Sequence, residues 1–306
     1  MPAGIINTGN HPKLLWLGVN AIWGQVYNEH QVECDQLYDW DTSDRAYEED
    51  VKLTGFGLAT VKPEGRAGSF DSELQGGITR YTHVAYSLGY IVTYEELKDN
   101  LYMEVSQRRA KANAFSMAQT VEVVSAFLWN NAFSSTYYTT WDGKAMIATD
   151  HTNVSGGSFS NSLSPAADLS EIALEDMCVQ IMQAKNDRGL NINIMPQSLH
   201  VAPAEWFNAN RILKSTLQSD TTSNNPNVLR MTNAFPGGIK VNHYFTNPSS
   251  WFVRTNVKDG LRAYWRERPS LERDNDFHTK NALALAYMRF SVGLTDPLAI
   301  FGSNRA

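Results

Sequence analysis

Residues 80–102 read RYTHVAYSLGYIVTYEELKDNLY, and the apolar pattern changes in the middle of this stretch. Along 84–92, large apolar residues alternate with other residues, which predicts a strand with one apolar face. Thr93 then fits a helix N-cap, and Glu96 three residues later completes a capping box. Apolar residues recur at spacings of mostly three and four as far as Ala132. We therefore predict one long strand that leads into one long helix over 93–131.

The predicted helix would be unusually long. Neither Pro nor Gly occurs from Thr93 to Ser135. At ~1.5 Å per residue, roughly 40 residues would span about 60 Å, far more than an average globular helix. We interpret this segment as a rigid spine.

Composition limits the classes of function. The chain has 306 residues, 42% of them hydrophobic, enough for one large domain or two closely joined ones. Its formal net charge of −6 disfavours a protein that binds nucleic acid by neutralising phosphates. Cys34 and Cys178 form no metal or redox motif, so we expect buried free thiols. We recognise neither a membrane span nor a targeting segment and expect synthesis in the cytoplasm.

Residues 1 to about 50 are predicted to form an arm without sustained periodicity. From Glu29 to Asp50 there are nine acidic residues and one base, Arg45. The region 254–273 is basic by contrast. These two regions could form ion pairs within one subunit or between two subunits, and the sequence leaves both options open.

A second strand is predicted at 52–62, paired with the strand that ends at Val92. The connection over 63–77 is long for a compact domain, and such connections are usually functional. A two-stranded hairpin is marginally stable alone in water, so we expect a neighbouring subunit to cover its apolar face.

The remaining pattern mixes helices with antiparallel-looking strands, which indicates an α+β fold. Helices are expected at 168–188, ended by Gly189, and from Pro203 to about 214. Residues 191–201 look extended, and 219–227 look like a loop. Further strands are expected at 238–245, 250–255, 260–266 and 282–292.

The search for catalytic, cofactor-binding and metal residues yields none. The glycine-rich stretch 55–60 lacks the third glycine and the following helix of a dinucleotide loop. The acidic run at 39–50 does not place Gly and Glu where a calcium loop needs them. Asp150 and His151 are sequence neighbours that point differently, no nucleophile elbow exists, and the seven histidines show no zinc spacing. We therefore predict that the protein is not an enzyme.

Residues 80–102 closely resemble major capsid proteins of tailed bacteriophages. Three further stretches match the same family in order: 143–153, 236–253 and 289–303. The Mu-like prophage major head subunit family looks related through Asp150-His151 and the C-terminal segment.

The resemblance implies the Hong Kong 97-type capsid fold. In that fold 1–51 would be an N-terminal arm and 52–92 an extended E-loop hairpin lying over an adjacent subunit. The peripheral domain, with the spine helix, would comprise 93–134 and 259–292. The axial domain would comprise 135–258 and 293–306.

The function implied is that of the major capsid protein of a phage head, assembling as hexamers and pentamers into an icosahedral shell that encloses double-stranded DNA without sequence-specific binding. A separate scaffolding protein and a portal are expected as partners, and a decoration protein is left open. The E-loop tip lacks the Lys and Asn that some relatives crosslink, so no crosslink is expected there. The alternatives are an encapsulin-like compartment shell and, remotely, a soluble hydrolase using His151. The residues expected at assembly interfaces are Arg66, Phe70, Arg80, Tyr81, His83, Arg266, Glu267 and Arg268.

Overall fold

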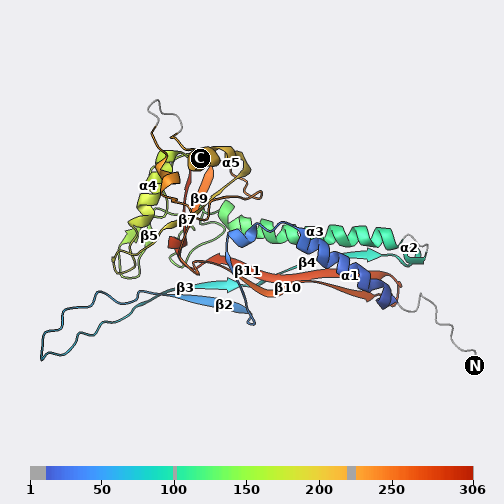
Figure 1. Ribbon diagram of the computed structural model, residues 1–306. Helices are drawn as coiled ribbons and strands as arrows, with labels where there is room; N and C mark the ends of the chain where they lie inside the picture. The colour runs from blue at the N-terminus through green and yellow to red at the C-terminus, as the bar shows by residue number, and fades with distance from the viewer. Residues whose placement is uncertain (1–11, 99–101, 219–224, 306) are drawn as a thin grey trace, which may run out of the picture.

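The protein is elongated, with a long sheet at one end, a compact part at the other, and a loop that projects away from both (Figure 1). The computed structural model describes residues 12–98, 102–218 and 225–305. Helices and strands are mixed without strict alternation, which confirms the α+β prediction.

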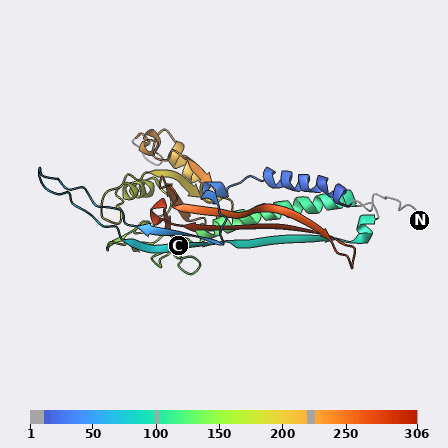
Figure 2. The ribbon, with the colours of Figure 1, turned by 90° about the horizontal axis from the view of Figure 1, so that it is seen from below.

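The long sheet has the strand order β1-β10-β11-β4. Its strands are β1 (Asp39–Thr42), β10 (Leu261–Asn275), β11 (Ala282–Leu294) and β4 (Val84–Val92). β1 is parallel to β10, and the other two pairings are antiparallel. Helix α3 (Tyr102–Asn130) runs along this sheet, and α1 (Pro12–Glu29) packs against α3 (Figures 1 and 2). The strands predicted at 84–92, 250–255 and 282–292 are confirmed, and the one at 260–266 extends to Asn275.

Small residues allow α3 to approach the sheet closely. On β11 the buried side chains alternate along the strand and are small at its start. They pack in one cluster with Ala110, Ala114, Met117 and Val121 of α3. Because burial follows period two on the strand and roughly 3.6 on the helix, one apolar face of each element is covered.

The predicted continuous helix over 93–131 is wrong. α2 (Tyr94–Lys98) is a separate short helix, and 99–101 lie outside the described residues. The predicted cap is present, since Glu96 N–H donates to Thr93 Oγ1 at 3.4 Å. Arg109, however, binds both carboxylate oxygens of Glu96 at 3.0 and 2.9 Å. Thirteen residues apart in one straight helix, these residues would be about 20 Å apart, so the chain must change direction between them.

The N-terminal segment is partly helical, and the prediction of an irregular arm is wrong for 12–29. Trp23 of α1 is buried, and its Nε1–H donates to Asn113 Oδ1 at 2.9 Å. Asn113 Nδ2 in turn donates to the carbonyl of Leu88 in β4 at 2.9 Å. Gly18 and Gly24 weaken the helical propensity of this segment, and packing against α3 compensates for them.

The acidic segment is bound within its own subunit. The 3₁₀ turn η2 (Cys34–Gln36) leads into β1, which lies beside β10. Three ion pairs then link the acidic segment to the basic one: Arg254–Asp39 at 2.5 Å, Arg262–Asp50 at 3.3 Å and Arg266–Asp44 at 3.9 Å. The intrasubunit alternative is therefore confirmed for these charges.

The hairpin consists of β2 (Tyr47–Leu53) and β3 (Gln75–Thr82), paired with each other. The prediction of a strand at 52–62 paired with 84–92 is wrong, because β4 pairs with β11. Gly55 has a φ of +66° just after β2 and ends the regular ladder. No part of 54–74 forms a strand.

The compact part contains a second sheet with the order β12-β9-β7-β8. Its strands are β12 (Ile300–Asn304), β9 (Ser250–Thr255), β7 (Pro196–Val201) and β8 (Ile239–Val241). Around it lie α4 (Glu171–Met182), η3 (Pro203–Glu205), α5 (Trp206–Lys214), α6 (Val228–Met231) and η4 (Pro297–Ala299), with a small hairpin of β5 (His151–Thr152) and β6 (Ser158–Phe159). α4 ends at Met182, whereas the predicted helix extends to Arg188. Gly189 lies in a separate turn, where its N–H donates to the Asn186 carbonyl. Most of the loop predicted at 219–227 lies outside the described residues.

Trp129, fully buried near the end of α3, joins the two parts of the molecule. It packs with Met146, Phe252, Leu261 and Ile300 in one cluster that contains side chains from both sheets. The long sheet and the compact part therefore share a continuous apolar core at their junction.

Candidate assembly surfaces

Residues 54–74, here called the projecting loop, extend far from the body of the molecule (Figures 1 and 2). The loop carries large apolar side chains in exposed positions, and Phe70 is 99% exposed. The others are Phe56, Leu58, Val61 and Leu74. Large apolar side chains concentrated in one exposed segment indicate a contact surface on a soluble protein.

The base of the projecting loop is fixed to the compact part by charge. Lys52 Nζ, at the end of β2, lies 3.1 Å from Asp296 Oδ2 and 3.5 Å from Asp187 Oδ2. Burial lowers the pKa of Lys52, but the two carboxylates outweigh it and raise the pKa above its ordinary value. Lys52 therefore remains charged and binds both acids.

Arg188 makes a second attachment at the same place. Its guanidinium donates to the carbonyls of Gly55, at 3.2 Å, and Ser72, and lies 3.7 Å from Asp71. These contacts hold both ends of the projecting loop to the turn at 185–191. We call Lys52, Asp187, Arg188 and Asp296 the loop anchor. Sequence analysis missed the anchor because its members are far apart in the chain.

The predicted interface residues lie in different environments. Arg66 and Phe70 are exposed in the projecting loop. Arg80 on β3 is paired with Glu49 at 2.6 Å and lies over the ring of Tyr47 at 4.5 Å. A residue with both partners in its own subunit stiffens the hairpin.

Tyr81 and His83 are buried and bind residues of their own subunit, so a role of these two residues at an assembly interface stays a prediction. Tyr81 is 2% exposed, and its hydroxyl lies 2.6 Å from Thr295 Oγ1. The ring of His83 lies between Ser291 Oγ at 2.9 Å and Ser43 Oγ at 3.1 Å. Burial, and then the charge of Arg289, lower the pKa of His83. These side chains hold the end of β3, and the residue that joins β3 to β4, to the long sheet.

Arg266, Glu267 and Arg268 lie where β10 is irregular. The register with β11 shifts on both sides of Glu267, and Glu267 and Arg268 are exposed. Bulges bend a strand and turn its side chains outward. The position therefore suits a contact surface, whereas Arg266 is also held by Asp44.

Sequence analysis also missed the far end of the long sheet. The turn between β10 and β11 carries Phe277, which is 90% exposed. Its only sequence signal is a large apolar residue among polar ones.

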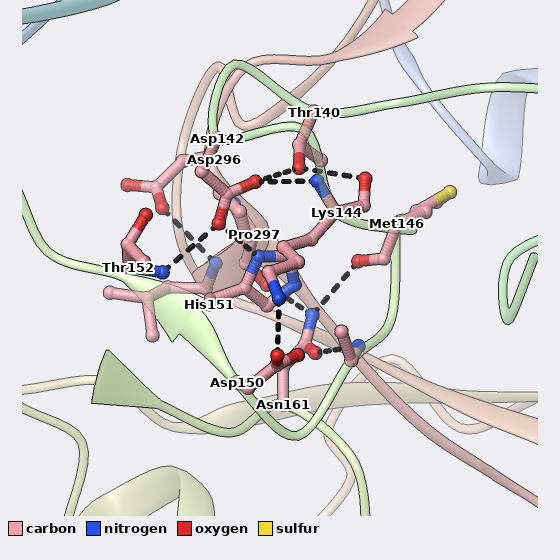
Figure 3. Close-up of polar contacts among 12 residues, drawn as sticks. Thr140, Asp142, Lys144, Met146, Asp150, His151, Thr152, Asn161, Asp296 and Pro297 are labelled. Atoms are coloured by element: carbon pink, nitrogen blue, oxygen red, sulfur yellow. Dashed lines mark hydrogen bonds and ion pairs between the residues drawn. The ribbon is translucent and has the colours of Figure 1, made fainter. Parts of the chain in front are cut away.

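Asp142 and His151 form a buried pair in the compact part (Figure 3). His151 Nδ1 lies 2.9 Å from Asp142 Oδ2, and the Asp142 carboxylate also accepts from Thr140 Oγ1 and from the Thr152 N–H. Burial raises the pKa of Asp142, but these hydrogen bonds outweigh it and hold the pKa below its ordinary value. His151 is 0% exposed, so no substrate reaches its ring.

Asn161 fixes the same loop to the C-terminal residues (Figure 3). Its amide donates to the carbonyls of Met146, Pro297 and Ile300 at 3.0 to 3.1 Å and accepts from the Ala148 N–H at 2.8 Å. Asp150, next to His151, points elsewhere and pairs with Lys144. The hydrogen bonds of this cluster therefore stabilise the fold of the compact part.

Glu122 is a buried carboxyl of α3 that faces Glu33 and Cys34, and it was not predicted from the sequence. Its Oε1 accepts from the Glu33 N–H at 2.9 Å, and its buried Oε2 has no hydrogen-bond partner within the described residues. Burial raises the pKa of Glu122 to about 7, and the nearby Glu33 carboxylate adds to the rise. Glu33 itself binds His243 of the compact part at 2.5 Å.

Within the described residues, no group of three or more His, Cys, Asp or Glu side chains could hold a metal ion. In the same part of the chain, every helix is too short or too polar to cross a membrane.

Comparison with known proteins gives the family. The sequence model of a family described as phage capsid protein matches residues 77–302. No curated protein matches the chain. Among solved structures, the capsid of the native GTA particle is similar at 12% identity and a TM-score of 0.55, covering 90% of this chain and 91% of its own.

Two other solved structures show the same likeness. The virus-like particle from Pyrococcus furiosus has 12% identity and a TM-score of 0.52, over 94% of this chain and 98% of that one. The protein of Gordonia phage Cozz has 13% identity and a TM-score of 0.51, over 90% and 87%. Identities this low show a common fold, the Hong Kong 97-type fold that the sequence predicted. Because the family match covers well over half of its length, the chain belongs to the phage capsid protein family.

Proposed function

We propose that copies of this chain assemble as hexamers and pentamers into the icosahedral head of a tailed phage, which encloses double-stranded DNA. The projecting loop is the observation that carries this proposal. It exposes Val61 and Phe70 almost completely, while the loop anchor fixes its base. A loop that is apolar, exposed and held at its base is suited to lie on a neighbouring subunit.

The proposed domains follow the chain in the predicted order, with two revisions. The N-terminal arm ends near 46 instead of 51, and the E-loop comprises β2, the projecting loop and β3 without β4. The peripheral domain contains α3 and the strands β4, β10 and β11, beside which the arm places β1, and the axial domain contains the sheet β12-β9-β7-β8. Strand pairing motivates both revisions, since β2 pairs with β3 and β4 pairs with β11.

The net charge of −6 suits a container for DNA better than a protein that grips it. We propose a separate scaffolding protein and a portal as partners, assembly in the host cytoplasm, and a Mu-like relationship. These proposals rest on the sequence resemblance.

The two alternatives are weaker. A hydrolase that uses His151 would need access to a ring that is 0% exposed. An encapsulin-like compartment protein would have the same fold, but the description of the family that matches this chain is phage capsid protein.

The test is expression of the chain alone and with candidate scaffolding proteins, followed by negative-stain microscopy. We expect shells, capsomers or tubes. A variant with Val61→Ser and Phe70→Ser should fold normally and lose closed shells, whereas Glu73→Gln in the same loop should keep them. Small discrete particles under every salt condition, with no assemblies, would contradict the proposal.

A further inference from the structure

Helix α5 presents an aromatic and basic surface. Trp206 and Phe207, at its first turn, are 47% and 71% exposed and lie against each other with ring centroids 4.9 Å apart. Arg211 and Lys214 follow on the exposed side of the same helix. Large aromatic groups and arginine are the residue types that dominate protein–protein contacts.

Helix α4 presents an acidic and apolar surface. Glu175 and Asp176 are exposed, and Val179 and Met182 follow one and two turns later, each 47% exposed. Beside Val179 and Met182 lies a mainly apolar groove of about 660 Å³, which also contains Met195, Pro196 and Val228. Glu175 lies at its edge.

The charges on both surfaces are unused in the described subunit. None of Glu175, Asp176, Arg211 and Lys214 forms an ion pair with another described residue. The two surfaces therefore have complementary charge and complementary apolar parts, and neither is covered.

The two helices belong to opposite edges of the axial sheet. α4 contacts β12, and α5 contacts β8, which are the two outer strands of the order β12-β9-β7-β8. In Figure 1 α4 lies to the left and α5 to the right of the strands, and the buried sides of both helices pack in one apolar cluster with the sheet. Asn208 Nδ2 donates to the Leu169 carbonyl at 3.0 Å and links α5 to the start of α4, so the two surfaces form parts of one rigid unit. One copy cannot bring them together, but two copies placed head to tail can.

We propose that the α5 surface of one copy docks on the α4 surface of the next copy, with Trp206 and Phe207 in the groove. This deepens the proposed function, on which it rests, by naming the two surfaces that meet within a ring of subunits. A heterologous contact of this type closes into a ring when its rotation permits.

Helix spacing favours an antiparallel arrangement. Arg211 is four residues after Phe207, and Glu175 is four residues before Val179, so each apolar-to-charge step is about 6 Å along its helix. With the helices antiparallel, Phe207 meets Val179 and Met182, while Arg211 meets Glu175 and Asp176. A parallel arrangement would place Lys214 in the apolar groove and leave its charge unpaired.

Cysteine crosslinking tests the contact. Met182→Cys and Phe207→Cys together should give, under mild oxidation of assembled particles, a ladder of covalent multimers that ends at five or six subunits. Either single variant should stay monomeric on a denaturing gel. The chain's own Cys178 lines the same groove and could pair with a cysteine at 207, so the double variant and both single variants also carry Cys178→Ala.

Charge exchange is the second arm. Arg211→Glu and Asp176→Arg should each reduce capsomer formation, and the double variant should restore it, with unchanged circular dichroism in all three. Shells that form normally but show no ladder and no charge rescue would overturn the docking proposal and leave the proposed function intact. A crosslink from Met182→Cys to a different protein would also overturn it. Failure of the unmodified chain to form any assembly would count against the proposed function itself.

Discussion

Replacing Glu122 with Gln should stabilise the protein more at pH 8 than at pH 5. The Glu122 carboxyl is 1% exposed, its Oε2 is without a hydrogen-bond partner within the described residues, and the Glu33 carboxylate is close. A neutral acid tolerates this environment better than a carboxylate does. Glutamine has nearly the same shape as the protonated acid and cannot ionise.

The magnitude follows from the pKa of Glu122, which rises from 4.5 to about 7 on folding. Each pKa unit corresponds to about 1.4 kcal/mol, so the shift corresponds to about 3 kcal/mol of unfolding free energy. Because the folded state binds this proton more tightly, the stability is present below pH 4.5 and is lost as pH rises through 7. The Gln variant should therefore exceed the unmodified chain by about 3 kcal/mol at pH 8 and by about 1 kcal/mol at pH 5.

Urea denaturation of purified capsomers at the two pH values would measure this difference. The Glu33 carboxylate is present in both proteins, and the variant removes only its repulsion of the Glu122 carboxylate, which is part of the effect measured. Glu95→Gln, on the exposed side of α2, is the matched control and should show no pH-dependent difference. Equal gains at both pH values, or a Gln variant that is less stable at pH 8, would refute the reasoning, since Glu122 would then be ionised and stabilising.

Three further predictions test other parts of the structure. Arg188→Ala should speed hydrogen exchange across 54–74 without moving the main unfolding transition, because Arg188 holds both ends of the projecting loop; unchanged exchange would show that the anchor does not restrain it. His151→Gln should lower the free energy of unfolding by up to about 3 kcal/mol, because Asp142 loses its buried partner. Calorimetry should show a lower thermal midpoint, and microscopy should still show particles. Gly260→Ala should destabilise by about 1–3 kcal/mol, because its new Cβ would lie 2.3 Å from the Ala299 Cβ, whereas Gly24→Ala in helix α1 meets no atom within 4 Å and should stabilise by up to about 1 kcal/mol. Calorimetry would reject the packing argument if these two glycine variants behaved alike.

The parts of the fold that follow local patterns could be predicted from the sequence. β4 and β11 have strong period-two alternation, and β9 was placed at its observed bounds. The family resemblance supplied the architecture that these elements build. The pairing partners of the strands were harder to predict. Several apolar strands could pair with β2 or with β4, and only long-range contacts select β3 for β2 and β11 for β4.

The errors have identifiable physical causes. Helix α1 contains two glycines and becomes stable only through contacts such as Trp23 with Asn113, which no local pattern shows. The sequence between α2 and α3 has neither Pro nor Gly, and the Glu96–Arg109 pair, which is incompatible with one straight helix, is a tertiary contact. Glu122 did leave a signal, since an acid between the apolar Val121 and Val124 on the buried side of a helix is unusual.

The contacts that attach the projecting loop and the N-terminal segment differ in kind from those that form the core. The junction around Trp129 is apolar and fully buried, so a change of angle there would expose its surface to water. The projecting loop is instead attached by Lys52, Asp187 and Arg188, and the N-terminal segment by Glu33 and His243 in addition to its apolar contacts. Ion pairs weaken with salt, most where a partner is exposed, as in Arg188–Asp71, and least where both are largely buried, as in Lys52–Asp187. If the subunit fits both hexamers and pentamers, as proposed, it needs a stiff core with attachments that can shift at low cost. On this reasoning, raising the salt concentration should increase hydrogen exchange first in 54–74 and leave the Trp129 junction protected, whereas simultaneous loss of protection in both would show that they move as one body.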